Sequence, residues 1–66
     1  MTIILNSQEH PLAQALTITE LLAELGLAGK PVVAELNQEA LSPGEHESRQ
    51  LRDGDRLELI TIAAGG

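Results

Sequence analysis

The chain ends in four small residues, and this end has the clearest chemical potential in the sequence. Ala63, Ala64, Gly65 and Gly66 follow directly after a run rich in aliphatic and β-branched residues. Fully extended, four residues reach roughly 13–14 Å, and none of these carries a side chain larger than a methyl group. We therefore expect residues 63–66 to form a mobile C-terminal tail that can thread a narrow active-site channel of another protein.

The reactive group of such a tail is the terminal carboxylate of Gly66. This group is ionised at neutral pH and reacts with nucleophiles only after activation. Attack of the carboxylate on the α-phosphate of ATP gives an acyl-adenylate, and sulfur attack on the adenylate gives a thiocarboxylate. The chain has neither of the common glycine-rich phosphate-binding loops. No bound cofactor is therefore expected, and a separate adenylating enzyme would use the ATP.

The side chains offer few alternatives to chemistry at the terminus. The chain has no cysteine, and His10 and His46 have no metal-ligand spacing with neighbouring carboxylates. We interpret both histidines as surface residues in loops and predict no metal site. Asp53 and Asp55 flank Gly54, so turn formation explains these two carboxylates better than a catalytic pair does. An enzyme in its own right is the least favoured class.

Length and charge restrict the partners. The 66 residues include twelve leucines and no aromatic residue, which fits one small domain with an aliphatic core. Ten acidic against four basic residues give a net charge of −6, which argues against nucleic acid and an anionic membrane as partners. The acidic balance suits a basic protein surface, or serves solubility alone. With no leader and no long apolar run, we expect a complete cytoplasmic chain.

The residue pattern predicts five short strands and one main helix, in the order β-β-α-β-β-β. A turn is expected over 6–9, and Pro11 confines the second strand to an edge of the sheet. The stretch over 42–48 is expected to be irregular or to form one short turn. The predicted strands cover Thr2–Asn6, His10–Leu16, Val32–Asn37, Ala40–Leu41 and Arg56–Ile62.

The helix is predicted between the second and third strands. Thr17 and Glu20 fit a capping box at its start, and Gly26 is placed to end it. Its apolar positions recur at i, i+3, i+4 and i+7, which gives it one apolar face, and they are Ile18, Leu21, Leu22 and Leu25.

These elements predict an α+β fold, a single ubiquitin-like β-grasp domain over residues 1–62 with a mixed sheet. The helix must bury its apolar face on the sheet, and the last strand would lie parallel to the first. Period-two alternation places toward the helix Ile3, Leu5, Leu57 and Leu59. The open face of the sheet is then predicted to carry an apolar partner-binding cluster of Ile4, Val33, Ile60 and Ile62.

Several short segments of the chain together resemble one family. They are Asn6, Thr17–Leu22, Glu35–Asn37, Pro43, Leu51–Asp55 and Gly65–Gly66. In these positions the chain resembles the ThiS family, the ubiquitin-like sulfur carriers of thiamine biosynthesis, over essentially its whole length.

The resemblance implies a mechanism and a set of partners. An E1-like adenylyltransferase (ThiF-like) would adenylate the Gly66 carboxylate, and a persulfide sulfur donor would convert it to a thiocarboxylate. A thiazole synthase (ThiG-like) would then consume the sulfur to build the thiazole ring. In this scheme the chain is a sulfur-carrying co-substrate, not an enzyme.

Three other interpretations stay open at this point. A MoaD-like carrier for molybdopterin synthesis uses the same chemistry, although such carriers are usually longer and richer in aromatic residues. A ubiquitin-like protein modifier uses the same adenylate with an amine as acceptor. An interaction module would have an idle tail, so that extending or blocking its C-terminus leaves function intact.

Overall fold

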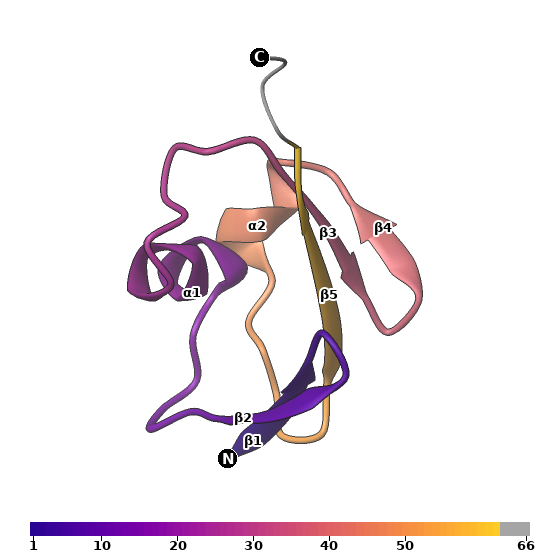
Figure 1. Ribbon diagram of the computed structural model, residues 1–66. Coiled ribbons are helices and arrows are strands. Elements are labelled where there is room, and N and C mark those ends of the chain that lie inside the picture. Colours follow the sequence, from indigo (N-terminus) through magenta and orange to yellow (C-terminus); the bar gives the residue numbers. More distant parts are fainter. Residues whose placement is uncertain (63–66) are drawn as a thin grey trace.

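The computed structural model describes residues 1–62, and the predicted tail over 63–66 lies outside the described residues. Figure 1 shows a sheet with both helices on one side of it. The predicted order of strands and main helix is confirmed, and the short turn expected before the last strand is a one-turn helix. The elements are β1 (Thr2–Leu5), β2 (Gln8–Pro11), α1 (Ile18–Glu24), β3 (Val32–Leu36), β4 (Glu39–Leu41), α2 (Glu45–Ser48) and β5 (Arg56–Thr61).

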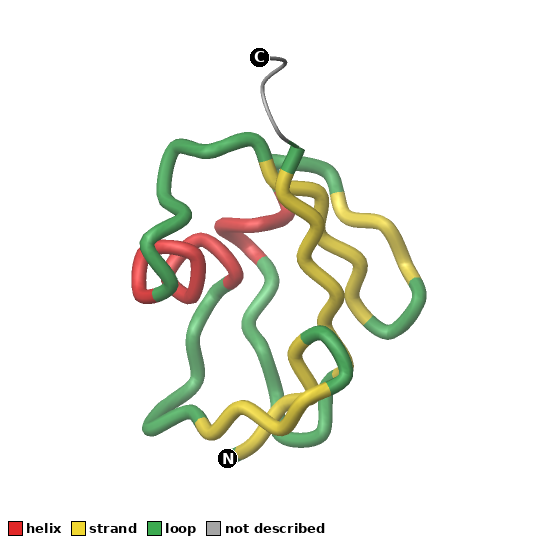
Figure 2. Tube along the Cα trace, viewed as in Figure 1, coloured by secondary structure: helices red, strands yellow, loops and turns green. Residues whose placement is uncertain are grey.

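The last strand lies at the centre of the sheet, whose strand order is β2-β1-β5-β3-β4 (Figure 2). β5 pairs parallel with β1, where Leu5 lies opposite Leu57. It pairs antiparallel with β3, where the register runs from Leu36 opposite Leu57 to Val32 opposite Thr61. The parallel pairing of the first and last strands is the predicted β-grasp arrangement. Strand β5 therefore ends in the middle of the sheet, not at an edge.

The first hairpin is tighter than predicted. Asn6 and Ser7 both have positive φ angles, 48° and 68°, and form the two-residue turn that favours a tight hairpin. The return strand therefore begins directly at Gln8 and ends at Pro11. The predicted strand over 10–16 is wrong beyond Pro11, where the chain leaves the sheet and crosses toward α1. The prediction that Pro11 lies on an edge strand is confirmed, because β2 stands at one end of the strand order, next to β1.

Helix α1 begins and ends where the sequence predicts. The Thr17 Oγ1 accepts from the Glu20 N–H (3.2 Å), and the Glu20 Oε1 accepts from the Thr17 N–H (2.9 Å), so the capping box is closed. Leu25 is the C-cap, and Gly26 follows with a φ of 75°, which glycine adopts without steric cost. No helix of the described residues is long and apolar enough to cross a membrane.

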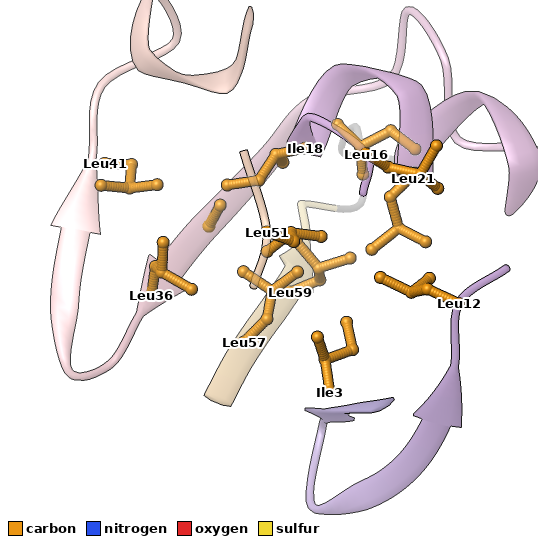
Figure 3. Close-up of a cluster of buried hydrophobic side chains, with 12 residues drawn as sticks. Ile3, Leu12, Leu16, Ile18, Leu21, Leu36, Leu41, Leu51, Leu57 and Leu59 are labelled. Atoms are coloured by element: carbon orange, nitrogen blue, oxygen red, sulfur yellow. The ribbon is translucent and has the colours of Figure 1, made fainter. Parts of the chain in front are cut away.

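The core lies between the sheet and the helices and is wholly aliphatic (Figure 3). Ile3 and Leu57 are fully buried and Leu59 nearly so, as strand alternation predicts, while Leu5 is partly buried at the margin. Within residues 1–62 no helix covers the opposite side of the sheet, so alternate residues of β3 and β5 face outward. The core side chains are Ile3, Leu12, Leu16, Ile18, Leu21, Leu22, Ala34, Leu36, Leu41, Leu51, Leu57 and Leu59.

Candidate functional site

Strand β5 leads to the predicted reactive end, and hydrogen bonds hold it on both sides. On the β1 side, the Asn6 N–H donates to the Leu57 carbonyl (2.9 Å). On the β3 side, the Ile62 N–H donates to the Pro31 carbonyl (3.1 Å). Pairing with the sheet thus extends to the last described residue of the chain, so the sheet fixes the position of Ile62.

Two asparagine side chains extend this pairing beyond the neighbouring strands. The Asn6 Oδ1 accepts from the Leu59 N–H (2.8 Å), and its Nδ2 donates to the Leu59 carbonyl (3.3 Å). At the start of β5, the Asn37 Oδ1 accepts from the Arg56 N–H (2.9 Å), and its Nδ2 donates to Asp55 Oδ1 (3.1 Å). Both asparagines lie in turns with positive φ. The Asn6 amide therefore satisfies both backbone groups of Leu59, and the Asn37 amide satisfies the backbone N–H of Arg56.

The residues predicted to carry the chemistry follow this anchored strand. Gly66, with its carboxylate, and the threading residues Ala63, Ala64 and Gly65 lie outside the described residues. The division of the chain into residues 1–62 and a tail therefore stays a prediction, as does the reactive role of Gly66.

Three of the four residues predicted to bind a partner gather beside the end of β5. Val33, Ile60 and Ile62 expose 41%, 59% and 54% of their surface, and Val33 lies directly opposite Ile60. Ile4 is partly buried and lies opposite Arg56, at the start of β5 and away from the other three. The structure thus confirms the exposure of three residues and separates Ile4 from them. Exposed apolar neighbours are typical of contact surfaces, and their binding role stays a prediction.

Two carboxylates face each other next to this apolar cluster. Glu35 and Glu58 are directly opposite in the β3–β5 register and lie on the same open face. Together with Gln38, Arg56 and Ile60 they line a hollow of about 260 Å³. Within residues 1–62 no ion pair joins Arg56 to either carboxylate. The sequence analysis missed this pair, because only the strand register brings the two acids together.

A larger hollow, of about 570 Å³, lies near the start of β5. Its lining comes from α2, the loop that follows it and the turn after β3, and includes Arg49, Arg52 and Asp55. Because it lies at the end of β5 opposite to Ile62, it does not belong to the site beside the C-terminus.

The histidines differ from the prediction and take no part in the site. His46 lies in α2 and is only 9% exposed, and its Nε2 has no hydrogen-bond partner in the described part of the chain. His10 lies in β2, partly buried, opposite Ile3. The prediction that both are surface loop residues is wrong. The one-turn helix α2 turns His46 inward, and the early start of β2 brings His10 into the sheet.

The two aspartates near the last strand have structural roles, as predicted. The Asp53 Oδ1 accepts from the Thr2 N–H (2.7 Å), and the Asp55 Oδ2 accepts from the Arg52 N–H (2.8 Å). Gly54 between them has a φ of 85°. Their carboxylates therefore close the turn before β5 and tie it to β1.

Comparison with known proteins agrees with the fold. The model of the ThiS family matches residues 2–66. The sulfur carrier protein ThiS of Thermus thermophilus is 40% identical over 62 residues, which cover 94% of this chain and 95% of that protein. The crystal structure of the thiamine biosynthesis protein ThiS from Geobacter metallireducens matches with a TM-score of 0.83 at 32% identity, over 100% of both chains.

A longer relative also matches the whole chain. A thiazole synthase of Paramagnetospirillum magneticum is 30% identical over 66 residues, which are 100% of this chain and 20% of that protein. The chain thus spans about a fifth of this relative and nearly all of the Thermus carrier. The match to the family model over 2–66, the full-length relatives and the β-grasp fold agree, and the chain belongs to the ThiS family.

Proposed function

We propose that this chain is a sulfur carrier of thiamine biosynthesis, and that the Gly66 carboxylate carries the sulfur as a thiocarboxylate. The observation that carries the proposal is the match to the ThiS family from residue 2 through Gly66. The sulfur carrier of T. thermophilus, similar over nearly its whole length, supports it. The anchoring of β5 up to Ile62 supports it further, because a partner that binds the sheet at this point also lies near the chain end.

The proposed chemistry needs only the terminal carboxylate from this chain. A carboxylate oxygen attacks the α-phosphate of ATP, and pyrophosphate leaves, so an acyl-adenylate forms. A persulfide sulfur then attacks the carbonyl carbon, and AMP leaves. A thiol cleaves the resulting sulfur–sulfur bond, which leaves the thiocarboxylate and a disulfide. An E1-like adenylyltransferase holds the ATP, and the carrier needs no cofactor of its own.

The proposed consumer of the sulfur is a thiazole synthase. The thiazole synthase of P. magneticum contains a segment similar to this entire chain. A covalent link keeps two modules at a high effective concentration, which suits a carrier and the enzyme that it serves. The present chain would likewise act beside a thiazole synthase, and the reaction would take place in the cytoplasm.

The open face beside β5 is the proposed docking surface for these enzymes. Three exposed residues lie on it: Ile60 in β5, Val33 opposite Ile60, and Ile62 directly after the strand. Contact at this position would bring the chain end to the partner's active site. Ile4, which lies farther along the face, would contact a partner only at the margin.

Variants of the chain end test this function. Deletion of Gly66, or addition of one alanine after it, should abolish thiazole formation in a mixture of the adenylyltransferase, sulfur donor and thiazole synthase. An alanine added before Met1 is the matched control and should keep normal activity. If the chain extended after Gly66 remains fully active, the terminal carboxylate is not the reactive group and the proposed function is wrong.

A further inference from the structure

The open face of the sheet keeps two like charges in a position that costs stability. Glu35 and Glu58 are directly opposite each other on β3 and β5, and their side chains lie on the same face. Like charges at such a position destabilise a strand pair. Glu35 is exposed and Glu58 partly buried, so solvent reaches both carboxylates. Within residues 1–62 the ion pair joins Arg49 to Glu45, and no ion pair joins Glu35 or Glu58 to a basic side chain.

The surroundings of the pair suit one kind of ligand. The hollow of about 260 Å³ that the two acids line also holds Arg56, so its formal charge is one negative in excess. Ile60, which also lines the hollow, lies opposite Val33, and both residues are well exposed. A long basic side chain can pack its methylene groups on such apolar residues and place its charge between carboxylates. An arginine fits best, because its planar guanidinium group has several N–H donors and can bond to both carboxylates at once.

We propose that Glu35 and Glu58 form an acidic clamp for an arginine or lysine of thiazole synthase. This inference rests on the proposed function, and it adds to it the residues that set how the carrier docks. The net charge of −6 favours a basic partner surface. In the clamp, the partner's cation removes a repulsion between two opposed carboxylates that the free chain carries.

The position of the clamp relates docking to the chain end. Glu58 precedes Ile62 by four residues in or next to the same extended segment, which corresponds to roughly 13 Å along a strand. A cation held in the clamp therefore fixes where β5 lies on the enzyme, and with it the point at which the chain end enters.

Neutral variants of the clamp test the inference. Glu35→Gln and Glu58→Gln remove one charge each, and Glu24→Gln removes one from the exposed end of α1 as the matched control. Affinity for thiazole synthase, measured by calorimetry with the unloaded chain, should fall about fivefold to tenfold for each clamp variant. The fall should be smaller at high salt. The control should bind within about twofold of the original chain.

Thermal unfolding of the same variants gives a second readout. Because repulsion is removed, Glu35→Gln should raise the melting temperature by about 1–4 °C while it weakens binding. A purely structural role would lower stability and binding together. An unchanged affinity in both clamp variants, or no binding of the original chain to thiazole synthase, would overturn the clamp. Failure of the proposed function is seen separately, as absence of sulfur on the original chain after incubation with the adenylyltransferase.

Discussion

At the scale of single residues, Asn6 joins distant parts of the sheet through its side chain. A turn at Asn6 can be predicted from the sequence, because asparagine tolerates a positive φ. Its partner cannot, because Leu59 is 53 residues away and only the parallel pairing of β1 and β5 brings the two together. The same holds for Glu35 and Glu58, which are ordinary acids in the sequence and become opposed only through register.

Substitution of Asn6 separates the effect of its side chain from that of its backbone. Asn6→Gly keeps the left-handed turn but loses both bonds to Leu59, so it should cost about 1–2 kcal/mol of unfolding free energy. Asn6→Ala loses the bonds and also strains the turn, and should cost about 1 kcal/mol more. Urea unfolding measures both values. If Asn6→Gly is as stable as the original chain, the amide does not stabilise β5.

Substitution of Gly65 tests the predicted threading of the tail. Gly65→Val adds a branched side chain to the predicted tail, so the melting temperature should stay within about 1–2 °C of the original. Adenylation should slow by about tenfold or more, because the side chain misplaces the carboxylate in a narrow channel. Pyrophosphate release by the adenylyltransferase measures this rate. Ala63→Gly is the control, because it changes the tail without adding side-chain volume. Normal kinetics for Gly65→Val would count against a narrow channel.

At the scale of the elements, helix ends were easier to predict than strand ends. The capping box and the glycine after α1 are local signals, and both are confirmed. The second strand was misplaced because a two-residue turn at Asn6 and Ser7 starts β2 earlier than the residue pattern indicates. The alternation of residues along β5 correctly predicts which side chains are buried and which are exposed. It does so because, within residues 1–62, the helices cover one face of the sheet and leave the other open.

The helix cap makes a measurable contribution to stability. Thr17→Ala removes the Oγ1 that accepts from the Glu20 N–H (3.2 Å) and should cost about 1 kcal/mol. Thr19→Ala, two residues later and exposed, removes a hydroxyl outside the cap and should be neutral or slightly stabilising. Chemical unfolding of the two variants measures the difference. Equal stability would show that the capping box contributes little.

A pair of neighbouring substitutions tests the faces of β5. Ile60→Asp adds a charge on the open face, so it should cost less than about 1 kcal/mol while it weakens binding of the partner enzymes. Leu59→Asp buries a carboxylate in the core and should unfold a domain of this size, whose total stability is roughly 3–10 kcal/mol. Circular dichroism shows whether each variant folds, and thermal unfolding measures its stability. A large loss of stability in Ile60→Asp would contradict the assignment of the open face.

At the scale of the whole molecule, the fold places one central strand between a closed core and an open face, and that strand ends next to the predicted reactive residues. The sequence alone predicts chemistry at the terminal carboxylate, because the chain lacks cysteine and phosphate-binding loops, and the reactive role of Gly66 stays a prediction. Of the four residues predicted for the docking surface, the structure brings three together. Ile4 has the same alternation as Ile60, but the short pairing of β1 with β5 places it at the far end of the face.

The central claim is that sulfur is carried on the Gly66 carboxylate. The most direct measurement is the intact mass of the chain after incubation with the adenylyltransferase, ATP and a cysteine-desulfurase sulfur source. Replacement of one oxygen by sulfur predicts a gain of about 16 Da, located at Gly66 by fragmentation, and no gain when ATP is omitted. An unchanged mass with an adenylyltransferase that is active on its own carrier, or a gain located at another residue, would contradict the account.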